Sequence, residues 1–327
     1  MKLRTEIKLT NAYPTISYKD NILLVGSCFS DNIGKYLDER KLPSTHNPLG
    51  IVYNPISIFK HMSFYARNPE DIDSDDLWAH NGVYSHRDFH SSNNRLSAEQ
   101  FLIDLRAQLI AWKEMISGCN LMFITLGTAW VYRDLKDKVI VGNCHKKPNK
   151  DFKKELLKIE DIVLSWGMVY DFLMNINPKM DIVFTVSPVK HIKNGLVDDS
   201  RSKSILIESC HQLTEKSQNT HYFPSYEILK DDLRDYRFYD EDLIHPSKVA
   251  IDYIWDQFKS AFLSPQTASL SDRIHSITRA KQHNPFNPEH SNHRDFCKNQ
   301  LATIREITNS FPTLNFSEEV KYFNSFI

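Results

Sequence analysis

The stretch ILLVGSCFS, residues 22–30, decides the fold. An apolar run leads up to Gly26, and Ile33, Tyr36 and Leu37 then follow at helical spacing. This pattern predicts a buried strand that breaks at a glycine and passes directly into a helix. Strand–helix units of this kind build parallel sheets, in which ligands bind at the carboxyl ends of the strands.

Other segments repeat the alternation of strands and helices. Strands are predicted at residues 121–126, at 182–186 and, more weakly, at Tyr222 and Phe223 before Pro224. Helices are predicted over residues 97–112, 152–175, 200–216 and 246–262, the first with Ser97 and Gln100 as a capping box and the last with Pro246 in its first turn. The predicted fold class is therefore α/β, a doubly wound, flavodoxin-like parallel sheet in three α/β/α layers.

Two regions depart from this alternation. Residues 61–94 are polar and rich in Asp, Asn and His, which indicates an insertion or a lid loop. After residue 264 the pattern is helical, with a turn-rich break at residues 284–288. We expect a catalytic domain over residues 1–263 and a helical C-terminal extension over residues 264–327.

Composition narrows the class of protein. The chain has 327 residues, with 40 Lys and Arg against 41 Asp and Glu, so we expect no general nucleic-acid binding and no polybasic membrane anchor. No apolar run approaches the roughly 18 residues of a membrane span, and the first residues lack a secretory signal pattern, which predicts a cytoplasmic protein. The cysteines are scattered and odd in number, which indicates no disulfide framework: Cys28, Cys119, Cys144, Cys210 and Cys297.

Two pairs of histidines have the spacing of metal ligands on a helix. His86 and His90 are four residues apart, and His290 and His293 are three apart. Both segments read as solvated loops or helix starts without a third ligand nearby, so no metal site is predicted.

The candidate chemistry lies at two places. Ser27 and Cys28 stand at the start of a helix, whose N–H groups lower a thiol's pKa and can hold an oxyanion. Far downstream, Asp242 precedes His245 by three residues, a spacing at which the carboxylate can orient the imidazole as a base. Each feature also has an ordinary interpretation, a turn in the first case and a helix-capping Asp beside a surface His in the second.

Together, the two features would meet at one edge of a doubly wound sheet. This arrangement resembles the SGNH (GDSL-like) hydrolase superfamily and, within it, the GSCFA family, named for its Gly-Ser-Cys-Phe-Ala motif. Here residues 26–30 read Gly-Ser-Cys-Phe-Ser, with serine in place of the final alanine. Further segments similar to the family follow in order: Asn47–Gly50, Leu126–Trp130, Asn143–Lys146, Thr185–Val189 and Tyr222–Glu227.

The resemblance implies acyl-ester chemistry through a nucleophile, a histidine and an aspartate. In the superfamily's first block, Gly-Asp-Ser, the third residue is the nucleophile, which favours Cys28 over Ser27. A cysteine there also resembles the Gly-Asn-Cys motif of a capsule-polysaccharide acetyltransferase family. Thiol exchange with a thioester is nearly balanced in energy, whereas thiol attack on an ordinary ester is uphill. An acyl-CoA is therefore an expected donor substrate, and no cofactor is predicted.

The oxyanion hole departs from the superfamily's pattern. Gly50 matches the glycine of the second block, but the third block, Gly-x-Asn, reads Gly127, Thr128 and Ala129. Loss of one such donor typically removes about 3 to 4 kcal/mol of transition-state stabilisation. Asn143 is the candidate substitute for this donor and Thr128 the alternative, whereas His145 and His191 are candidate substrate-binding residues.

Two functions follow as hypotheses. The first is an acyl-ester hydrolase or O-acyltransferase acting on an acylated carbohydrate or a related small ester or thioester. The second is a catalytically impaired module of the same fold that binds carbohydrate or a protein partner, motivated by the alanine at position 129.

Overall fold

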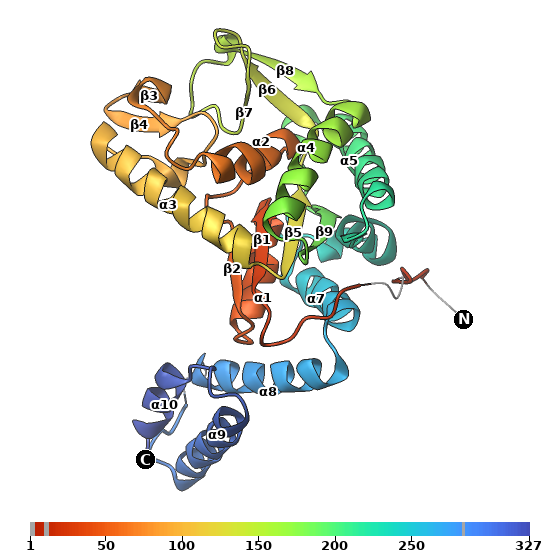
Figure 1. The fold of residues 1–327 in the computed structure, drawn as a ribbon. Helices are drawn as coiled ribbons and strands as arrows, with labels where there is room; N and C mark the ends of the chain where they lie inside the picture. Colours follow the sequence, from red (N-terminus) through yellow and green to blue (C-terminus); the bar gives the residue numbers. More distant parts are fainter. Residues whose placement is uncertain (1–3, 10–12, 283–284) are drawn as a thin grey trace.

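The computed structural model describes residues 4–9, 13–282 and 285–327, and these residues form a central sheet of five parallel strands (Figure 1). The strands lie in the order β10-β9-β5-β1-β2. Their bounds are β1 (Ile22–Gly26), β2 (Ser44–His46), β5 (Leu121–Leu126), β9 (Asp181–Val186) and β10 (Thr220–Tyr222). This is the flavodoxin-like order, and its switch point lies between β1 and β5. The doubly wound α/β fold is confirmed.

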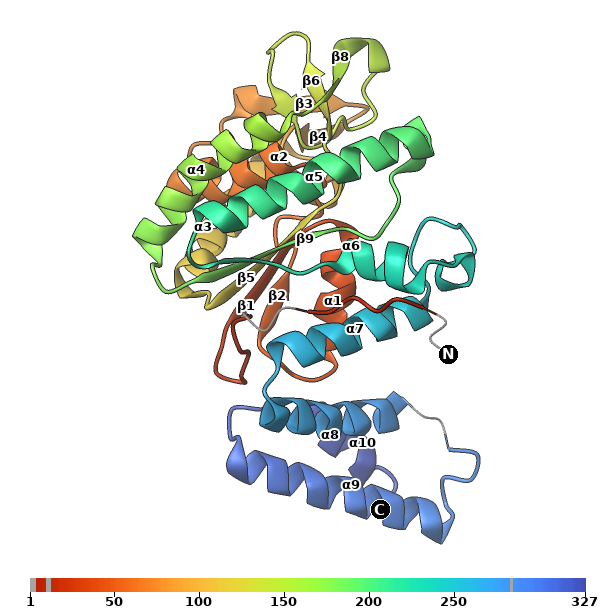
Figure 2. The same ribbon diagram turned by 90° about the vertical axis from the view of Figure 1, so that its right-hand side faces the viewer.

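Alternation along the strands builds two hydrophobic cores, one on each face of the sheet. Leu23 and Val25 belong to one cluster, whereas Ile22 and Leu24 belong to the other. Figure 2 shows the helices on the two sides. The first face is covered by α2 (Pro55–Lys60), α3 (Ala98–Gly118), α4 (Ile159–Ile176) and α5 (Leu196–Lys216), the second by α1 (Cys28–Asp38) and α7 (Lys248–Phe262). The sheet is thus the middle of three layers.

The predicted helices need three corrections. Residues 152–175 are not one helix, because β8 (Phe152–Leu156) pairs with β6 (Trp130–Asp134) before α4 begins at Ile159. Pro246 lies before the helix, since Ser247 caps α7 and accepts a hydrogen bond from the Ala250 N–H.

The third correction concerns the capping box of α3. The Ser97 hydroxyl accepts a hydrogen bond from the Gln100 N–H at 3.3 Å, as predicted. However, the Gln100 amide donates to Asp104, one turn further along the helix, and does not return to the cap.

The segment 61–94, expected as an insertion or a lid loop, consists largely of regular elements. It continues α2 as a π-helical turn and then forms the hairpin of β3 (Leu77–His80) and β4 (Val83–His86). His86, Asp88 and Phe89 are buried, because this segment packs over the first core. Shorter elements are η1 (His61–Tyr65), η2 (Ser74–Asp76), η3 (Ser91–Asn93), β7 (Ile140–Val141), η4 (Asn149–Asp151), η5 (Ile192–Asn194), α6 (Ser225–Glu227), η6 (Ile228–Leu233) and η7 (Tyr236–Phe238).

The helical C-terminal extension is confirmed. It consists of α8 (Pro265–Gln282), α9 (Ser291–Ser310) and α10 (Ser317–Asn324), and its apolar residues join the second core. Both views place these helices below α7, far from β6 and β8 (Figures 1 and 2). Asn284, in the predicted turn-rich break, lies outside the described residues. Within the described part of the chain, every helix is too short or too polar to span a membrane.

Candidate functional site

The turn between β1 and α1 presents Cys28 and hides Ser27. Ser27 is only 1% exposed, because its N–H donates to the Thr125 carbonyl at 3.1 Å and its hydroxyl caps the Phe29 N–H at 3.3 Å. Cys28, the first residue of α1, is half-buried and carries a free thiol. Of the two predicted nucleophiles, Cys28 has the accessible side chain.

Asn47, in the second block around Gly50, is hydrogen-bonded to the turn between β1 and α1. Its side-chain oxygen accepts a hydrogen bond from the Gly26 N–H at 2.8 Å, and its amide donates to Asp31 at 2.7 Å. The Gly50 N–H donates to the Asn47 carbonyl at 2.8 Å and closes the loop. The predicted oxyanion donor Gly50 therefore already has an acceptor in this structure, and its role stays a prediction.

Groups around Cys28 shift the pKa of its thiol in opposite directions. Burial raises the pKa of the thiol, and the nearby Asp31 carboxylate raises it further. The backbone N–H groups of Cys28 and Phe29 and the ammonium of Lys203 oppose this rise. Because the raising effects prevail, the resting group is a thiol that needs a base.

The third block, residues 127–129, is fixed by hydrogen bonds to Tyr53 and Ser202. The N–H groups of Gly127 and Thr128 both donate to the Tyr53 carbonyl, at 2.8 and 3.1 Å. The Ala129 N–H donates to the Ser202 hydroxyl at 2.7 Å, and the buried Thr128 hydroxyl lies 3.1 Å from the same oxygen. Thr128 thus holds the turn together, and its hydroxyl is occupied.

Tyr53 is a site residue that sequence reasoning missed. Its ring is 40% exposed and lies 6.4 Å, centroid to centroid, from His191. Burial of its hydroxyl raises the pKa of Tyr53, and the nearby Cys28 adds to the rise. Tyr53 therefore links Cys28 to the predicted substrate contact His191, whose own pKa is lowered by burial. Nothing in the sequence around Tyr53 distinguished it from a loop tyrosine.

Lys203 is a second missed residue. It lies on α5, is 1% exposed, and donates to the carbonyls of Gly127 and Ser187, both at 2.8 Å. These carbonyls end β5 and β9, so the ammonium joins two strand ends beside Cys28. The sequence did carry a signal, because Lys203 shares the buried stripe of α5 with Leu206, Cys210 and Leu213.

Asp242 and His245 meet as predicted. The Asp242 carboxylate lies 2.6 Å from the His245 Nδ1, and its other oxygen accepts the N–H groups of Ile244 and His245. The hydrogen bond from His245 lowers the pKa of Asp242 to about 2. This carboxylate can orient the imidazole and leave its Nε2 as a base.

The loop that carries this pair is attached to the segment after β9. Lys190 donates to it twice, from its backbone N–H to the Ile244 carbonyl and from its ammonium to the Leu243 carbonyl, both at 3.2 Å. The Asp242 and His245 side chains are 45% and 48% exposed. Within the described residues, neither a hydrogen bond nor an ion pair connects His245 to Cys28.

Asn143 and His145 stabilise a separate turn. The Asn143 side-chain oxygen accepts the His145 N–H at 2.9 Å, and the His145 Nε2 lies 2.9 Å from the His86 carbonyl. Burial lowers the pKa of His145. In the described part of the chain, no hydrogen bond joins Asn143 to the Cys28 turn, so its role as an oxyanion donor stays a prediction.

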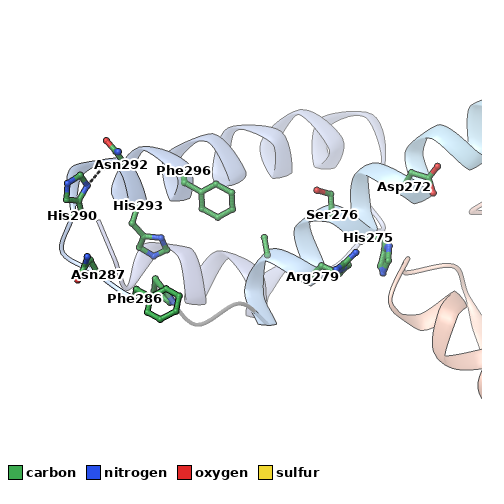
Figure 3. A pocket seen from close by; sticks show the side chains of 12 residues that line it. Asp272, His275, Ser276, Arg279, Phe286, Asn287, His290, Asn292, His293 and Phe296 are labelled. Carbon is green, nitrogen blue, oxygen red and sulfur yellow. Dashed lines mark hydrogen bonds between the residues drawn. The ribbon is translucent and has the colours of Figure 1, made fainter. Parts of the chain in front are cut away.

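Two of the cavities formed by the described residues hold several polar side chains away from the Cys28 turn. One, of about 260 Å³, lies beside the Asp242–His245 loop and is lined by Lys190, Asp199, Tyr226, Lys230, Arg234, Tyr236 and Tyr239, among others. The other, of about 850 Å³, lies between α8 and α9, with Arg279, Phe286, His290 and His293 around it (Figure 3). His290 caps α9 there, and the described residues contain no group of three or more metal-ligating side chains that could hold an ion.

Comparison with known families gives two matches. The model of the GSCFA family matches residues 21–258. The model of the GSCFA domain protein, C-terminal domain, matches residues 274–327. No curated protein matches the chain.

Proposed function

The chain belongs to the GSCFA family, and from this premise we propose that it is an acyl-ester hydrolase or O-acyltransferase with Cys28 as its nucleophile. The observation that carries the proposal is the 2.6 Å contact between Asp242 and His245, on a loop attached behind the end of β9. The resemblance of the motifs to the SGNH superfamily supports it further. Free cysteines throughout the chain fit a reducing cytoplasm.

The proposed reaction passes through an acyl-cysteine. The Nε2 of His245 accepts the proton of the Cys28 thiol, and the thiolate attacks the acyl carbonyl. The bond to the leaving group then breaks, and His245 returns the proton to that group. Water or a sugar hydroxyl next gives its proton to His245 and attacks the acyl-cysteine, which releases the acid or the new ester together with the free thiol.

Backbone N–H groups at the start of α1 are the proposed oxyanion donors. The Cys28 N–H lies in the first turn of α1, where the helix dipole adds to its effect. The Gly50 N–H is the second proposed donor, and in this structure it donates to the Asn47 carbonyl at 2.8 Å. The alanine at position 129 leaves the third donor of the superfamily without a counterpart at its usual place.

The 260 Å³ cavity beside the Asp242–His245 loop is the proposed substrate recess. Its charged lining consists of Lys190, Lys230 and Arg234 against Asp199 and Asp235, and this small excess of positive charge favours a donor that carries negative charge. The ammonium of Lys190 lies 3.7 Å from the ring centre of Tyr239. An acyl-CoA, an anionic thioester, fits this lining and the thiol nucleophile together.

Intact-mass spectrometry tests the proposal. The protein is incubated with acetyl-CoA or with a short-chain aryl ester, and the wild type is compared with Cys28→Ala, Ser27→Ala and His245→Ala. We expect an acyl adduct in the wild type and in Ser27→Ala, none in Cys28→Ala, and a slow one in His245→Ala. Cys144→Ala is the matched control, because Cys144 is the other half-buried thiol. An adduct that persists in Cys28→Ala contradicts the proposal.

A binding module is the second candidate. The observation that favours it is that the Ala129 N–H is already bonded to Ser202, which leaves no spare donor at that residue. This function predicts saturable glycan binding that is unchanged in His245→Ala, and a Cys28 that reacts with iodoacetamide no faster than a free thiol. Reactivity of Cys28 that depends on His245 would contradict it.

A further inference from the structure

Lys203 is a buried cation whose hydrogen bonds, in the described part of the chain, go to backbone carbonyls. Its ammonium has three N–H donors, and two of them bond the Gly127 and Ser187 carbonyls. Among the described residues, no carboxylate forms an ion pair with it. Lysines are almost never fully buried unless they are paired, because removing the charge from water is costly. Besides the two carbonyls, the ring centre of Tyr226 lies 5.7 Å from the ammonium, so a positive charge is kept at the strand ends without a direct ion pair among the described residues.

The charge remains largely present at neutral pH. Burial lowers the pKa of Lys203 to about 8, while Asp199 and Cys28 favour the charged form. Asp199 is itself engaged, since its carboxylate accepts the His191 N–H at 2.9 Å. Asp199 keeps its charge there, and the neighbouring Lys230 opposes the charge of Lys203. Cys28 lies close by, because the Ser27 N–H donates to the carbonyl of Thr125, two residues before Gly127. Unlike Asp199, Cys28 gains negative charge only when its thiol loses a proton.

Two neighbouring residues of α5, Ser202 and Lys203, form hydrogen bonds with the third block, residues 127–129. Ser202 binds the Ala129 N–H and Lys203 binds the Gly127 carbonyl, at 2.7 and 2.8 Å. The superfamily's pattern has a side-chain amide in this segment, whereas this chain has alanine at position 129 and a buried ammonium directly behind the motif. The alanine at position 129 and the buried Lys203 therefore both belong to the surroundings of this block.

We propose that Lys203 is the fixed positive charge of the site and that its ammonium stabilises the thiolate form of Cys28. The proposal rests on the proposed role of Cys28 as nucleophile. The charge limits the effects of burial and of Asp31 on the thiol, so that a neutral imidazole can remove its proton. Lys203 acts through Cys28 and is a positioning residue, not a catalytic one.

The alkylation rate of Cys28 by iodoacetamide, followed against pH by intact mass, tests this directly. A Cys144→Ser background leaves Cys28 as the half-buried thiol, because the other three cysteines are buried. Lys203→Gln keeps N–H donors for the two carbonyls and removes the charge, whereas Lys203→Arg keeps the charge. In Lys203→Gln we expect alkylation at pH 7, where the parent's Lys203 is still charged, to slow about tenfold, and the difference from the parent to narrow above about pH 8. In Lys203→Arg the rate at pH 7 should stay near the parent's.

A purely structural role predicts the same alkylation rate at pH 7 in folded Lys203→Gln as in the parent, and that result would overturn the proposal. If Lys203→Gln does not fold, a reciprocal measurement replaces it. NMR titration of labelled lysine side chains gives the Lys203 midpoint in the parent and in Cys28→Ala, with Lys203→Arg to assign the signal. Because coupling is reciprocal, the midpoint should fall in Cys28→Ala, and an unchanged midpoint refutes the charge interaction.

These measurements need no acyl donor. A shifted alkylation profile without any acyl adduct would refute the proposed function and keep the role of Lys203. An acyl adduct on Cys28 together with an alkylation profile that is unchanged in Lys203→Gln would support the proposed function and refute the role of Lys203.

Discussion

At the scale of single residues, Gly26 is the position on which the Cys28 turn depends. Its φ is +120°, a conformation that favours glycine, and a Cβ built there would lie 2.1 Å from the Thr125 carbonyl oxygen. Thr125 pairs with Gly26 across the sheet, so neither backbone can move without breaking the β1–β5 register. The turn that exposes Cys28 therefore exists only with glycine at position 26.

We expect Gly26→Ala to lower the free energy of unfolding by at least about 2 kcal/mol, because it adds strain and a backbone clash. Urea denaturation followed by circular dichroism measures this. Gly167→Ala is the matched control, since Gly167 lies within α4 with open space around it, and alanine there should be neutral or stabilise by up to about 1 kcal/mol. Equal losses in both variants would contradict the clash.

Asp242 is the residue that fixes the orientation of His245. Because the pKa of Asp242 is lowered to about 2, its carboxylate stays charged over the whole neutral range. Asp242→Asn should slow acylation of Cys28 by roughly 10²- to 10⁴-fold, since an amide favours the wrong imidazole tautomer. The rate of adduct formation at saturating acetyl-CoA measures this. Glu241→Gln, at the exposed neighbouring residue, should leave the rate unchanged.

At the scale of elements, the buried segment around β4 is sensitive to acid. Burial lowers the pKa of His61 and of His86 to about 4, so both imidazoles are neutral in the folded chain. The unfolded chain binds protons at the ordinary value of 6.5. The free energy of unfolding should therefore fall as pH drops from about 6.5 to 4, by up to about 3 kcal/mol for each histidine.

Urea denaturation at a series of pH values measures this dependence. His86→Asn keeps an acceptor for the Asp88 N–H but cannot titrate, so its stability should vary less steeply with pH. His80→Asn, on the exposed end of β3, is the control and should follow the wild type. A slope in His86→Asn equal to that of the wild type would show that His86 does not contribute.

The elements of the central sheet could be predicted because each carries its own signal. β1, β5 and β9 are apolar runs buried on both faces, and such runs are visible in the sequence. The segment of β8 is predicted as helix, because Phe152 and Leu156 are four residues apart with three charged residues between them, and only the pairing with β6 makes it a strand. Such strands depend on a distant partner, which local pattern does not reveal.

The residues of the candidate site likewise fall into those that the sequence predicts and those that only the packing reveals. Cys28 and the Asp242–His245 pair stand in local motifs, so the sequence identified them. Tyr53 and Lys203 reach the site only through the packing of a loop and of α5 against the strand ends. Gly50 and Thr128 matched motif positions, yet their polar groups are used within the fold.

At the scale of the whole molecule, the two family regions share one core. The second hydrophobic cluster runs from β1 and α1 through α7 into α8, α9 and α10. Arg40 marks the junction, since its guanidinium lies 4.5 Å from the Trp255 ring centre and 3.1 Å from the His275 Nδ1. Because these contacts cross the boundary, we expect both regions to unfold together.

Arg40→Ala should lower the free energy of unfolding by about 2 kcal/mol, because it removes buried contacts on both sides of the junction. All tryptophans lie within residues 21–258, so their fluorescence follows that region, while far-UV circular dichroism also follows the C-terminal helices. In the wild type the two urea transitions should coincide. Arg273→Ala, at an exposed ion pair, is the control and should change stability by less than about 0.5 kcal/mol. A circular dichroism transition that precedes the fluorescence transition would contradict a shared core.

The position of β1 inside the sheet also has a consequence for biosynthesis. β1 leaves the ribosome before its neighbour β5, which begins at Leu121, and long before α7, which covers its second face and begins only at Lys248. A nascent chain thus carries an apolar strand whose second face stays uncovered until α7 has been made, which invites chaperone binding and self-association. Refolding yield from urea should accordingly fall as protein concentration rises, whereas a strand at the sheet's edge that paired late would impose no such delay.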